Sequence, residues 1–346
     1  MKGEDKAMVE EKDERFDSAA RSICERLRRP LLALPAGVKE RVQEIRLRIN
    51  RPVCLCCAGG TYFPGPGGRL TLKPDAGTPV TDRQDLEESF RNLCSYSIYS
   101  HENEIRNGYV TLSGGHRAGV CGTAVLQDGT VCGMRDVSSI NLRIAREIRG
   151  AADALLDGLG NHIWKGLLLV GAPSSGKTTI LRDLARQLSG GGRGNLKKVA
   201  VIDERGEIAG TYLGAPQNDL GCCCDVLDGY PKAEGILIAL RTLSPEIILC
   251  DEIGSDREVD AVEQGLNAGV TVIASIHAAN AAELLKRRQA QRLLRTGAFG
   301  NVALLDPNRG PGLVAAIYKA GDLLAQADGS PASDRGGGSF GLCGIA

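Results

Sequence analysis

The sequence predicts an α/β protein whose main domain is built on a parallel sheet and is preceded by a smaller α+β domain. Its 346 residues are enough for two domains, each with a core of its own. From Lys165 onward, apolar runs of strand length alternate with stretches of helical spacing. This alternation indicates a parallel sheet with helices on both faces. Before it, residues 24–150 mix helix-like stretches with short alternating segments such as 44–50.

The larger domain is expected to repeat a unit of one buried strand followed by one helix. The apolar run 166–170 leads into a glycine-rich turn, and 177–188 carries its apolar residues on one helical face. The expected strands are 166–170, 198–203, 246–251 and 270–276, and the expected helices are 177–188, 232–242, 256–268 and 280–295.

The smaller domain is expected to contain a helix at 85–93, a hairpin of 109–112 with 118–125, and a strand at 141–145. Gly and Pro clusters between such segments mark turns. The predicted organisation is a charged arm at 1–20 that is disordered or a frayed helix, the α+β domain at 21–150, the larger domain at 151–324 and a disordered tail at 325–346.

Residues 171–178 read Gly-Ala-Pro-Ser-Ser-Gly-Lys-Thr, a complete G-x-x-x-x-G-K-[ST] phosphate loop between an expected strand and an expected helix. In such a loop, successive N–H groups point at phosphate oxygens beside a helix N-terminus, whose dipole favours anions. Lys177 is expected to reach the β- and γ-phosphates, and Thr178 to place its hydroxyl on Mg²⁺. The fold expected is a RecA-like/AAA+ P-loop NTPase domain with ATP and Mg²⁺ as cofactors. The expected nucleotide-binding residues are Gly171, Ala172, Pro173, Ser174, Ser175, Gly176, Lys177, Thr178 and Thr179.

A second apolar strand ends in two carboxylates, Asp251 and Glu252, which is the pattern of a Walker B element. Hydrolysis needs a carboxylate for Mg²⁺ and a group that places the attacking water. Asp251 is expected to hold the metal, and Glu252 to polarise the water. The alternative is a strand that merely ends in solvated acids, but its place downstream of the phosphate loop favours the catalytic interpretation.

Polar side chains end two further strands. Asp203 and Glu204 follow the strand at 198–203, and His277 follows the strand at 270–276. Because parallel strands deliver their carboxyl ends to one crevice, these groups are expected to face the same nucleotide and to act in catalysis. A histidine there can bind a γ-phosphate or the attacking water, although a loop histidine satisfied by backbone groups fits the position equally well.

Composition excludes some classes of function. Acidic and basic residues balance at 42 each, so overall charge favours neither nucleic acid nor an anionic surface. The charged N-terminus lacks the apolar region of a signal peptide, and no apolar run approaches the ~18 residues of a membrane span. A cytoplasmic protein with reduced thiols is expected. The clusters Cys54/Cys56/Cys57 and Cys222/Cys223/Cys224 lack the spacing of a zinc site.

The order of phosphate loop, Asp203-Glu204, Asp251-Glu252 and Ser275-Ile-His277 resembles the hexameric ATPases of type II and type IV secretion and pilus machines. Those proteins carry a Walker A element, an aspartate box, a Walker B element and a histidine box in this order. More narrowly, the chain resembles the stage III sporulation protein AA family of endospore-forming bacteria. The stretches that carry this resemblance are 44–52, 104–109, 113–117, 141–147, 201–205, 225–229, 231–235 and 244–246.

The resemblance implies a cytoplasmic ATPase, peripheral on the mother cell side of the membrane, that docks on a channel between mother cell and forespore. Its implied partners are copies of itself in a ring and membrane channel proteins. The resemblance also favours His277 as a γ-phosphate sensor. The chain departs from the family pattern at 222–224, where three cysteines stand in a place that usually holds an arginine.

Secretion ATPases also supply arginines from the N-terminal domain to the nucleotide of an assembled ring. By this resemblance, Arg143 and Arg146 before the interdomain linker, and Arg117 on the glycine-rich hairpin, are candidate trans arginines. The alternative is that these arginines are solvated or form structural ion pairs.

Two other functions are compatible with the same motifs. One is a nucleic-acid-translocating P-loop ATPase, which would use basic residues at 286–295. Few aromatic residues are available to stack on bases, and a basic run of this kind is more often a solvated face or a subunit contact, so nucleic acid is not expected as a partner. The other is a nucleotide switch without hydrolysis, which requires Glu252 to be idle.

Overall fold

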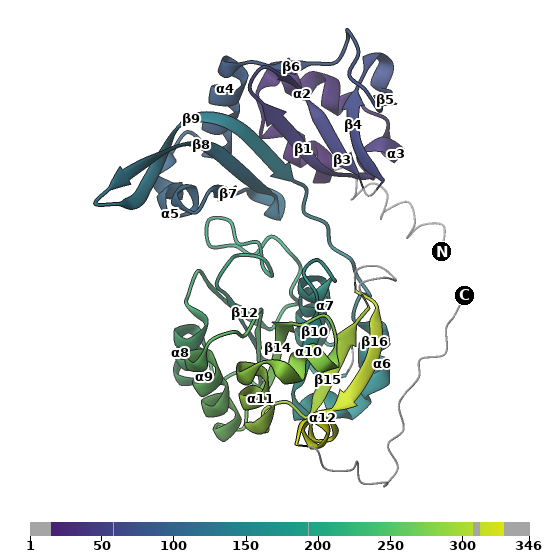
Figure 1. The fold of residues 1–346 in the computed structure, drawn as a ribbon, viewed down its shortest axis with the longest axis vertical. Helices are drawn as coiled ribbons and strands as arrows, with labels where there is room; N and C mark the ends of the chain where they lie inside the picture. The colour runs from purple at the N-terminus through teal and green to yellow at the C-terminus, as the bar shows by residue number, and fades with distance from the viewer. Residues whose placement is uncertain (1–14, 58, 193, 307–311, 329–346) are drawn as a thin grey trace. The chain divides into compact units, whose positions relative to one another are not determined.

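The computed structural model describes residues 15–57, 59–192, 194–306 and 312–328. Within them the chain forms two compact units (Figure 1). Unit 1 takes the described residues up to Arg146 together with Gly210–Gln217, and unit 2 takes the others. The first boundary, at 146/147, lies close to the expected one at 150/151, but the sequence had assigned 210–217 to the larger domain.

A seven-stranded sheet forms the centre of unit 2. Neighbouring strands pair in parallel, except for the last two, which are antiparallel. In order across the sheet, the strands are β12 (Cys224–Asp228), β11 (Val199–Asp203), β13 (Ile247–Cys250), β14 (Thr271–His277), β10 (Leu167–Gly171), β15 (Asn301–Leu305) and β16 (Val314–Lys319).

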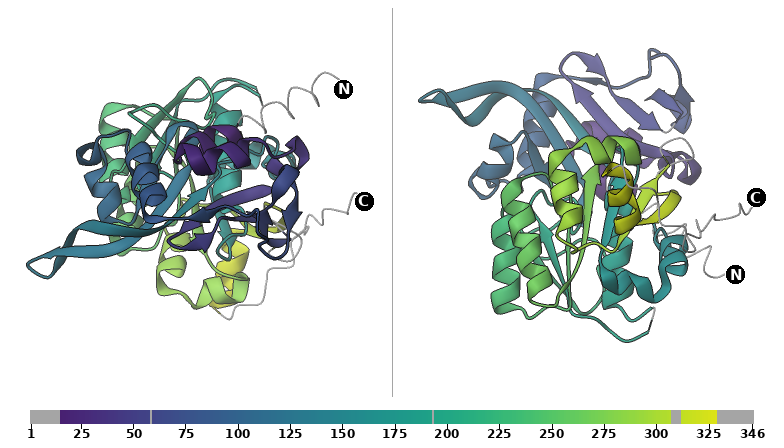
Figure 2. Two further views of the ribbon diagram at one scale, coloured as in Figure 1. Left: turned by 90° about the horizontal axis from the view of Figure 1, so that it is seen from above. Right: turned by 60° about the horizontal axis from the view of Figure 1, so that its bottom comes forward.

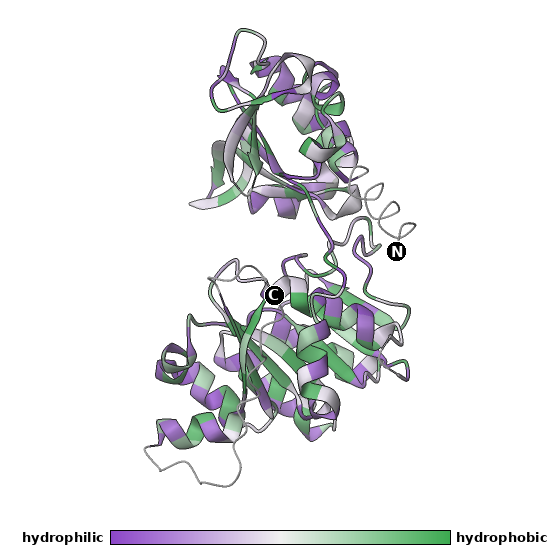
Figure 3. Ribbon diagram, turned by 90° about the vertical axis from the view of Figure 1, so that its right-hand side faces the viewer, coloured by the Kyte–Doolittle hydropathy of each residue, from purple (hydrophilic) through white to green (hydrophobic). Residues whose placement is uncertain are grey.

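Helices cover both faces of this sheet because successive strand residues point to opposite sides. Leu167 and Leu169 join one core cluster, with α6 (Asp153–Leu159), η4 (Gly160–Lys165) and α7 (Lys177–Ser189). Leu168 and Val170 join the other. Figure 3 shows the central strands as the most hydrophobic part of the unit. The second face packs against α8 (Lys232–Thr242), α9 (Asp256–Asn267), α10 (Ala281–Lys286), α11 (Arg288–Arg295) and α12 (Ala320–Ala327).

The prediction of an α/β domain with a parallel sheet is confirmed. Each expected strand lies within a residue or two of β10, β11, β13 or β14. The helix expected at 280–295 is divided into α10 and α11, since Arg287 between them has an extended backbone. Three strands were not predicted: β12, β15 and β16. The cysteine cluster at 222–224, whose last residue opens β12, gave no alternating pattern, yet β12 continues the sheet beside β11.

Unit 1 is an antiparallel sheet packed against helices. In order across the sheet, its strands are β5 (Leu70–Thr71), β4 (Gly60–Pro64), β3 (Cys54–Cys57), β1 (Val42–Arg48), β9 (Thr130–Arg143), β8 (Arg117–Gln127) and β7 (Tyr109–Thr111). Figure 2 shows the far ends of β8 and β9 extending beyond their neighbours as a two-stranded arm. The remaining elements are α2 (Glu25–Leu32), α3 (Ala36–Lys39), η1 (Pro66–Gly68), α4 (Arg83–Leu93), η2 (Ile98–His101), α5 (Glu102–Arg106), η3 (Ser113–Gly115) and the pair β2 (Arg51–Pro52) with β6 (Val80–Thr81).

The sequence predicted a disordered arm or a frayed helix at 1–20, and the part that the structure describes is instead a packed helix. Residues 15–21 are helical, and Phe16, Ala19 and Ala20 are fully buried in the core of unit 1. The charged residues around them hid this short apolar face. The disordered tail predicted at 325–346 is wrong at its start, where 325–327 belong to α12. Residues 1–14 and 329–346 lie outside the described residues. None of the helices in the described ranges is long and apolar enough to cross a membrane.

Candidate functional site

The phosphate loop joins β10 to α7 through a backbone that only small residues allow. Gly176 caps α7 with φ +92°, a left-handed conformation that favours glycine. A Cβ on Gly171 would clash with the Ser175 side chain, which would have to shift. The Ser175 hydroxyl is buried and has no hydrogen-bond partner among the described residues. A buried orphan hydroxyl beside a helix N-terminus fits a loop that holds an anion.

Lys177 is buried at the centre of this loop. Its ammonium donates to the carbonyls of Gly171 and Ala172, each at 2.9 Å, and to Nδ1 of His277 at 3.0 Å. Burial lowers the pKa of Lys177, while the charges of Asp251 and Glu252 oppose this shift. An ammonium has three donors, and these contacts use all of them. A phosphate that binds Lys177 must therefore replace at least one of these acceptors.

Thr178 and Asp251 bring the phosphate-loop helix and the end of β13 together. Thr178 Oγ1 donates to Oδ2 of Asp251 at 2.8 Å. The other oxygen, Oδ1, accepts from the buried hydroxyl of Ser275 and from the backbone N–H of Glu252. Mg²⁺ in phosphate sites takes a few hard oxygen ligands from the protein and completes its shell with water and phosphate. This pair of donor groups fits Mg²⁺.

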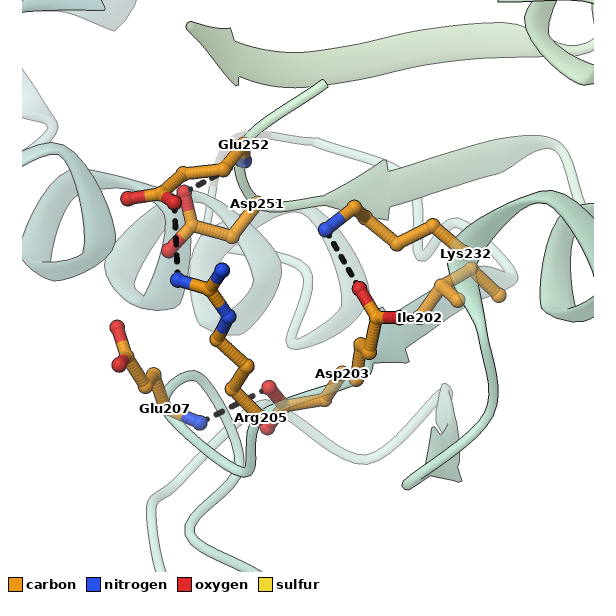
Figure 4. A pocket seen from close by; sticks show the side chains of 8 residues that line it. Ile202, Asp203, Arg205, Glu207, Lys232, Asp251 and Glu252 are labelled. Atoms are coloured by element: carbon orange, nitrogen blue, oxygen red, sulfur yellow. Dashed lines mark hydrogen bonds and ion pairs between the residues drawn. The ribbon is translucent and has the colours of Figure 1, made fainter. Parts of the chain in front are cut away.

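Glu252 is held at its backbone and at both carboxylate oxygens. Its φ is +43°, which is uncommon for a residue with a side chain, and its N–H donates to Asp251 Oδ1 at 2.9 Å and to Ser275 Oγ at 3.0 Å. Oε1 lies 2.5 Å from Nε2 of His277. Oε2 lies 3.1 Å from Nη1 of Arg205, a contact drawn in Figure 4. Backbone strain of this kind concentrates at functional sites.

Asp203 and Glu204 have other partners. The Asp203 carboxylate accepts backbone N–H groups of Glu207, Ile208 and Ala209 at 2.9, 3.0 and 2.7 Å. Burial raises the pKa of Asp203 to about 6, against the lowering effect of these N–H donors. The sequence predicted catalytic roles for both acids, and that prediction remains untested. The Asp203 geometry favours a role in shaping the loop that follows β11.

Glu204 pairs with a buried lysine that the sequence did not single out. Its Oε2 lies 2.7 Å from Nζ of Lys232, whose side chain is only 7% exposed (Figure 4). Glu258 lies 3.8 Å from the same ammonium. Although burial lowers the pKa of Lys232, the bond to Glu204 and the charge of Glu258 raise it overall. The Glu204 carboxylate therefore serves first to neutralise a buried cation.

Strand order explains why these groups meet. β14 lies between β10 and β13, and β11 lies beside β13, so four carboxyl ends stand in one row. In register, Gly171 of β10 pairs with His277 of β14. A cleft of about 340 Å³ opens beside this row, and its lining includes Arg205, Glu252 and His277. The carboxyl ends of the four strands thus lie along one edge of the sheet.

The candidate trans arginines lie in unit 1 and differ in their surroundings. Arg146 donates to the carbonyls of Lys39 and Val42 at 3.0 and 2.7 Å. Arg117 stacks over the ring of Tyr109, with 3.6 Å from its guanidinium carbon to the ring centroid. The side chain of Arg143 is 68% exposed, and its Nε lies 3.8 Å from Glu44. These contacts favour a structural role for Arg146. Arg143 is the more accessible candidate for a trans arginine.

The sequence left Ser275, Arg205 and Lys232 without a site role. Ser275 stands two residues before His277 on β14, so both side chains lie on the same side of the sheet. Arg205 directly follows Asp203 and Glu204. Those positions were the available signals. Lys232 gave none, because its role depends on burial against α9.

The family model described as sporulation stage III, protein AA matches residues 13–323. The chain belongs to this family. A relative in Bacillus subtilis (strain 168), stage III sporulation protein AA, is 39% identical over 316 residues, which are 91% of this chain and 99% of that protein. The resemblance drawn from the sequence is confirmed.

More distant relatives match a smaller part of this chain. The uncharacterized protein ycf45 of Cyanidium caldarium is 28% identical over 181 residues, which are 49% of this chain and 49% of that protein. Among solved structures, the ATPase DotB of Legionella pneumophila is similar with a TM-score of 0.48 and 17% sequence identity. That match covers 76% of this chain and 72% of the DotB chain.

Proposed function

We infer that this family member is a Mg²⁺-dependent ATPase whose turnover drives conformational work. The observation that carries this proposal is the hydrogen bond of 2.8 Å between Thr178 Oγ1 and Asp251 Oδ2. It supports the proposal because the phosphate-loop hydroxyl and the carboxylate that follows β13 are close enough to share one metal ion. Glu252, the next residue, then lies at the same edge.

Each residue of the site has a proposed role. Thr178 and Asp251 would hold Mg²⁺, which would supply positive charge against the phosphates when bound. Residues 171–179 would cradle the phosphates, with Lys177 on the β- and γ-phosphates. Glu252 would accept a proton from the attacking water as general base. His277, which contacts both Lys177 and Glu252, would sense the γ-phosphate. We propose that Asp203 positions the loop that follows β11.

Family membership supports a proposal about the assembly. The protein would form a homo-oligomeric ring, with an arginine of unit 1 from a neighbouring copy completing the site. The ring would dock on membrane channel proteins of the sporulation apparatus, on the mother cell side, and would power a secretion-like channel. ATPase activity that rises more than linearly with protein concentration would support a site shared between copies. Strictly proportional rates down to high dilution would exclude a trans arginine.

The proposed activity can be tested with two variants and their controls. Lys177→Ala should lose most affinity for a fluorescent ATP analogue, whereas Lys319→Ala, an exposed lysine of unit 2, should bind normally. Glu252→Gln should bind ATP normally and lose turnover, with Glu263→Gln as the exposed control. Normal ATP binding by Lys177→Ala would contradict the phosphate-loop assignment. Normal turnover by Glu252→Gln would show that the general base lies elsewhere.

The basic residues of α11 do not support the nucleic-acid alternative. Arg292 pairs with Asp256 and Asp260, and Arg295 pairs with Asp328 at 2.6 Å. Carboxylates therefore neutralise most of the face that the sequence offered as a basic track. We expect ATP turnover to be unchanged by added single- or double-stranded DNA. Stimulation of turnover by DNA at physiological salt would favour the nucleic-acid motor instead.

A further inference from the structure

Four side chains form one polar chain across the nucleotide site. Lys177 contacts Nδ1 of His277 at 3.0 Å, His277 contacts Glu252 at 2.5 Å, and Glu252 contacts Arg205 at 3.1 Å. An ammonium only donates, so Nδ1 of the imidazole accepts and Nε2 carries the proton. His277 therefore donates to one carboxylate oxygen of Glu252, and Arg205 donates to the other.

These two donors fix the direction of a side chain whose backbone cannot turn. The Glu252 N–H is bound by Asp251 and Ser275, and its left-handed φ of +43° leaves little freedom. The Glu252 carboxylate is held by its contacts with His277 and Arg205. Of these two donors, His277 is itself tied to Lys177, the residue proposed to change partners when phosphate binds.

Arg205 stands on a rigid base. It lies in the loop that follows β11, between Asp203 and the three residues whose N–H groups Asp203 accepts. Asp203 is only 2% exposed, so the hydrogen bonds that hold this loop are buried. Arg205 itself is open to solvent, with 61% of its side chain exposed. An exposed ion pair adds little to stability, so its contact with Glu252 needs a different explanation.

We propose that Arg205 is a positioning residue for Glu252. It holds Oε2 of the Glu252 carboxylate in place when Lys177 leaves His277 for a phosphate. Glu252 then keeps the direction that it needs to accept a proton from the attacking water. This inference rests on the proposed function, because it assumes that Glu252 is the general base. It adds a role for a side chain that neither the motifs nor the family name assigns.

The test compares Arg205→Ala, Arg205→Lys and the control Arg241→Ala, which removes an exposed arginine from α8. For each protein, kcat and KM for ATP, the Kd of a non-hydrolysable ATP analogue and the melting temperature are measured. Arg205→Ala should lower kcat about tenfold or more, because misorienting a catalytic group is costly. Its analogue Kd should stay within about twofold of the wild type, and its melting temperature should not change. Arg205→Lys should recover most of kcat, since an ammonium can still donate to the carboxylate.

The proposal is overturned if Arg205→Ala keeps wild-type kcat. If, in addition to that unchanged kcat, analogue binding is weakened tenfold, Arg205 contacts phosphate directly instead. A melting temperature that falls in step with kcat would instead assign Arg205 a structural role. These outcomes are distinct from failure of the proposed function. That failure would appear as a wild-type protein without ATPase activity, or as a Glu252→Gln variant with normal turnover.

Discussion

The hydroxyl of Thr178 lies 2.8 Å from Oδ2 of Asp251, although the two residues are 73 positions apart in the sequence. This contact joins the first turn of α7 to the end of β13. The remaining oxygen of Asp251 is held by Ser275 and by the N–H of Glu252. One carboxylate thus organises the phosphate loop, the strand end and the proposed general base.

The first prediction concerns the hydroxyl of Thr178. Thr178→Ala should remove most of the gain in ATP affinity that Mg²⁺ provides, about tenfold, because the metal loses a direct ligand. Thr178→Ser keeps the hydroxyl and should behave as the wild type. The measurement is titration with a fluorescent ATP analogue in Mg²⁺ and in EDTA. An equal gain from Mg²⁺ in wild type and Thr178→Ala would show that the hydroxyl is not a metal ligand.

The second prediction concerns Ser275, which is fully buried on β14. Its hydroxyl donates to Asp251 and accepts the N–H of Glu252, so it aligns both acids. Ser275→Ala should lower kcat about tenfold and leave the affinity for the ATP analogue within about twofold. Thr242→Ala, which removes an exposed hydroxyl at the end of α8, is the control. A Ser275→Ala variant that turns over ATP at the wild-type rate would refute the alignment role.

A third prediction separates Glu204 from Glu252. The Glu204 carboxylate lies 2.7 Å from the buried ammonium of Lys232, so its loss leaves that cation with Glu258 alone. Glu204→Gln should lower the free energy of unfolding by about 1–3 kcal/mol and reduce kcat by less than about threefold. Denaturant unfolding and steady-state kinetics measure the two effects. Loss of turnover in a protein of normal stability would restore Glu204 to the catalytic residues.

A fourth prediction distinguishes the arginines of unit 1. Arg146 donates to two backbone carbonyls, and Arg146→Ala should lower the free energy of unfolding by about 1.5–3 kcal/mol. Arg143→Ala should change it by less than about 0.5 kcal/mol, since that side chain is largely exposed. If Arg143 acts in trans, its variant should lose the extra ATPase activity seen at high protein concentration. Equal stability of the two variants would contradict the structural role of Arg146.

The site was largely predictable because its chemistry is local in the sequence. Residues 171–178 form a contiguous motif, and Asp251 and His277 each end an apolar run. The role of Ser275 was not predictable, because it depends on how β14 registers with β13, where Cys250 pairs with Ala274. Arg146 reaches carbonyls 107 and 104 residues away, which no local pattern encodes.

The fold shows the same limit. The strand–helix units of unit 2 follow from periodicity, whereas two features depend on long-range packing. One is β12, which forms only as a neighbour of β11. The other is the segment Gly210–Gln217, which belongs to unit 1 although its flanking residues belong to unit 2. In that segment, Gln217 accepts the N–H of Gly114 at 2.8 Å, a contact across 103 residues of sequence.

The last prediction concerns pH and His116, a buried histidine of unit 1 whose Nδ1 accepts the N–H of Ala145 at 3.0 Å. Burial lowers the pKa of His116 from 6.5 to about 4, so the unfolded chain binds the proton more readily than the folded one. The contribution of His116 to the free energy of unfolding is therefore fully present above about pH 6.5 and is lost as pH falls towards 4. The loss is about 2–3 kcal/mol at pH 4.5. His116→Asn keeps an acceptor for Ala145 but does not titrate, so its loss over this range should be smaller. Hydrogen exchange of β7 and β8 peptides at pH 7 and 4.5, corrected for the intrinsic rate, measures the difference, with the exposed His162→Asn as control. The same decline in wild type and His116→Asn would show that another group controls the acid sensitivity of unit 1.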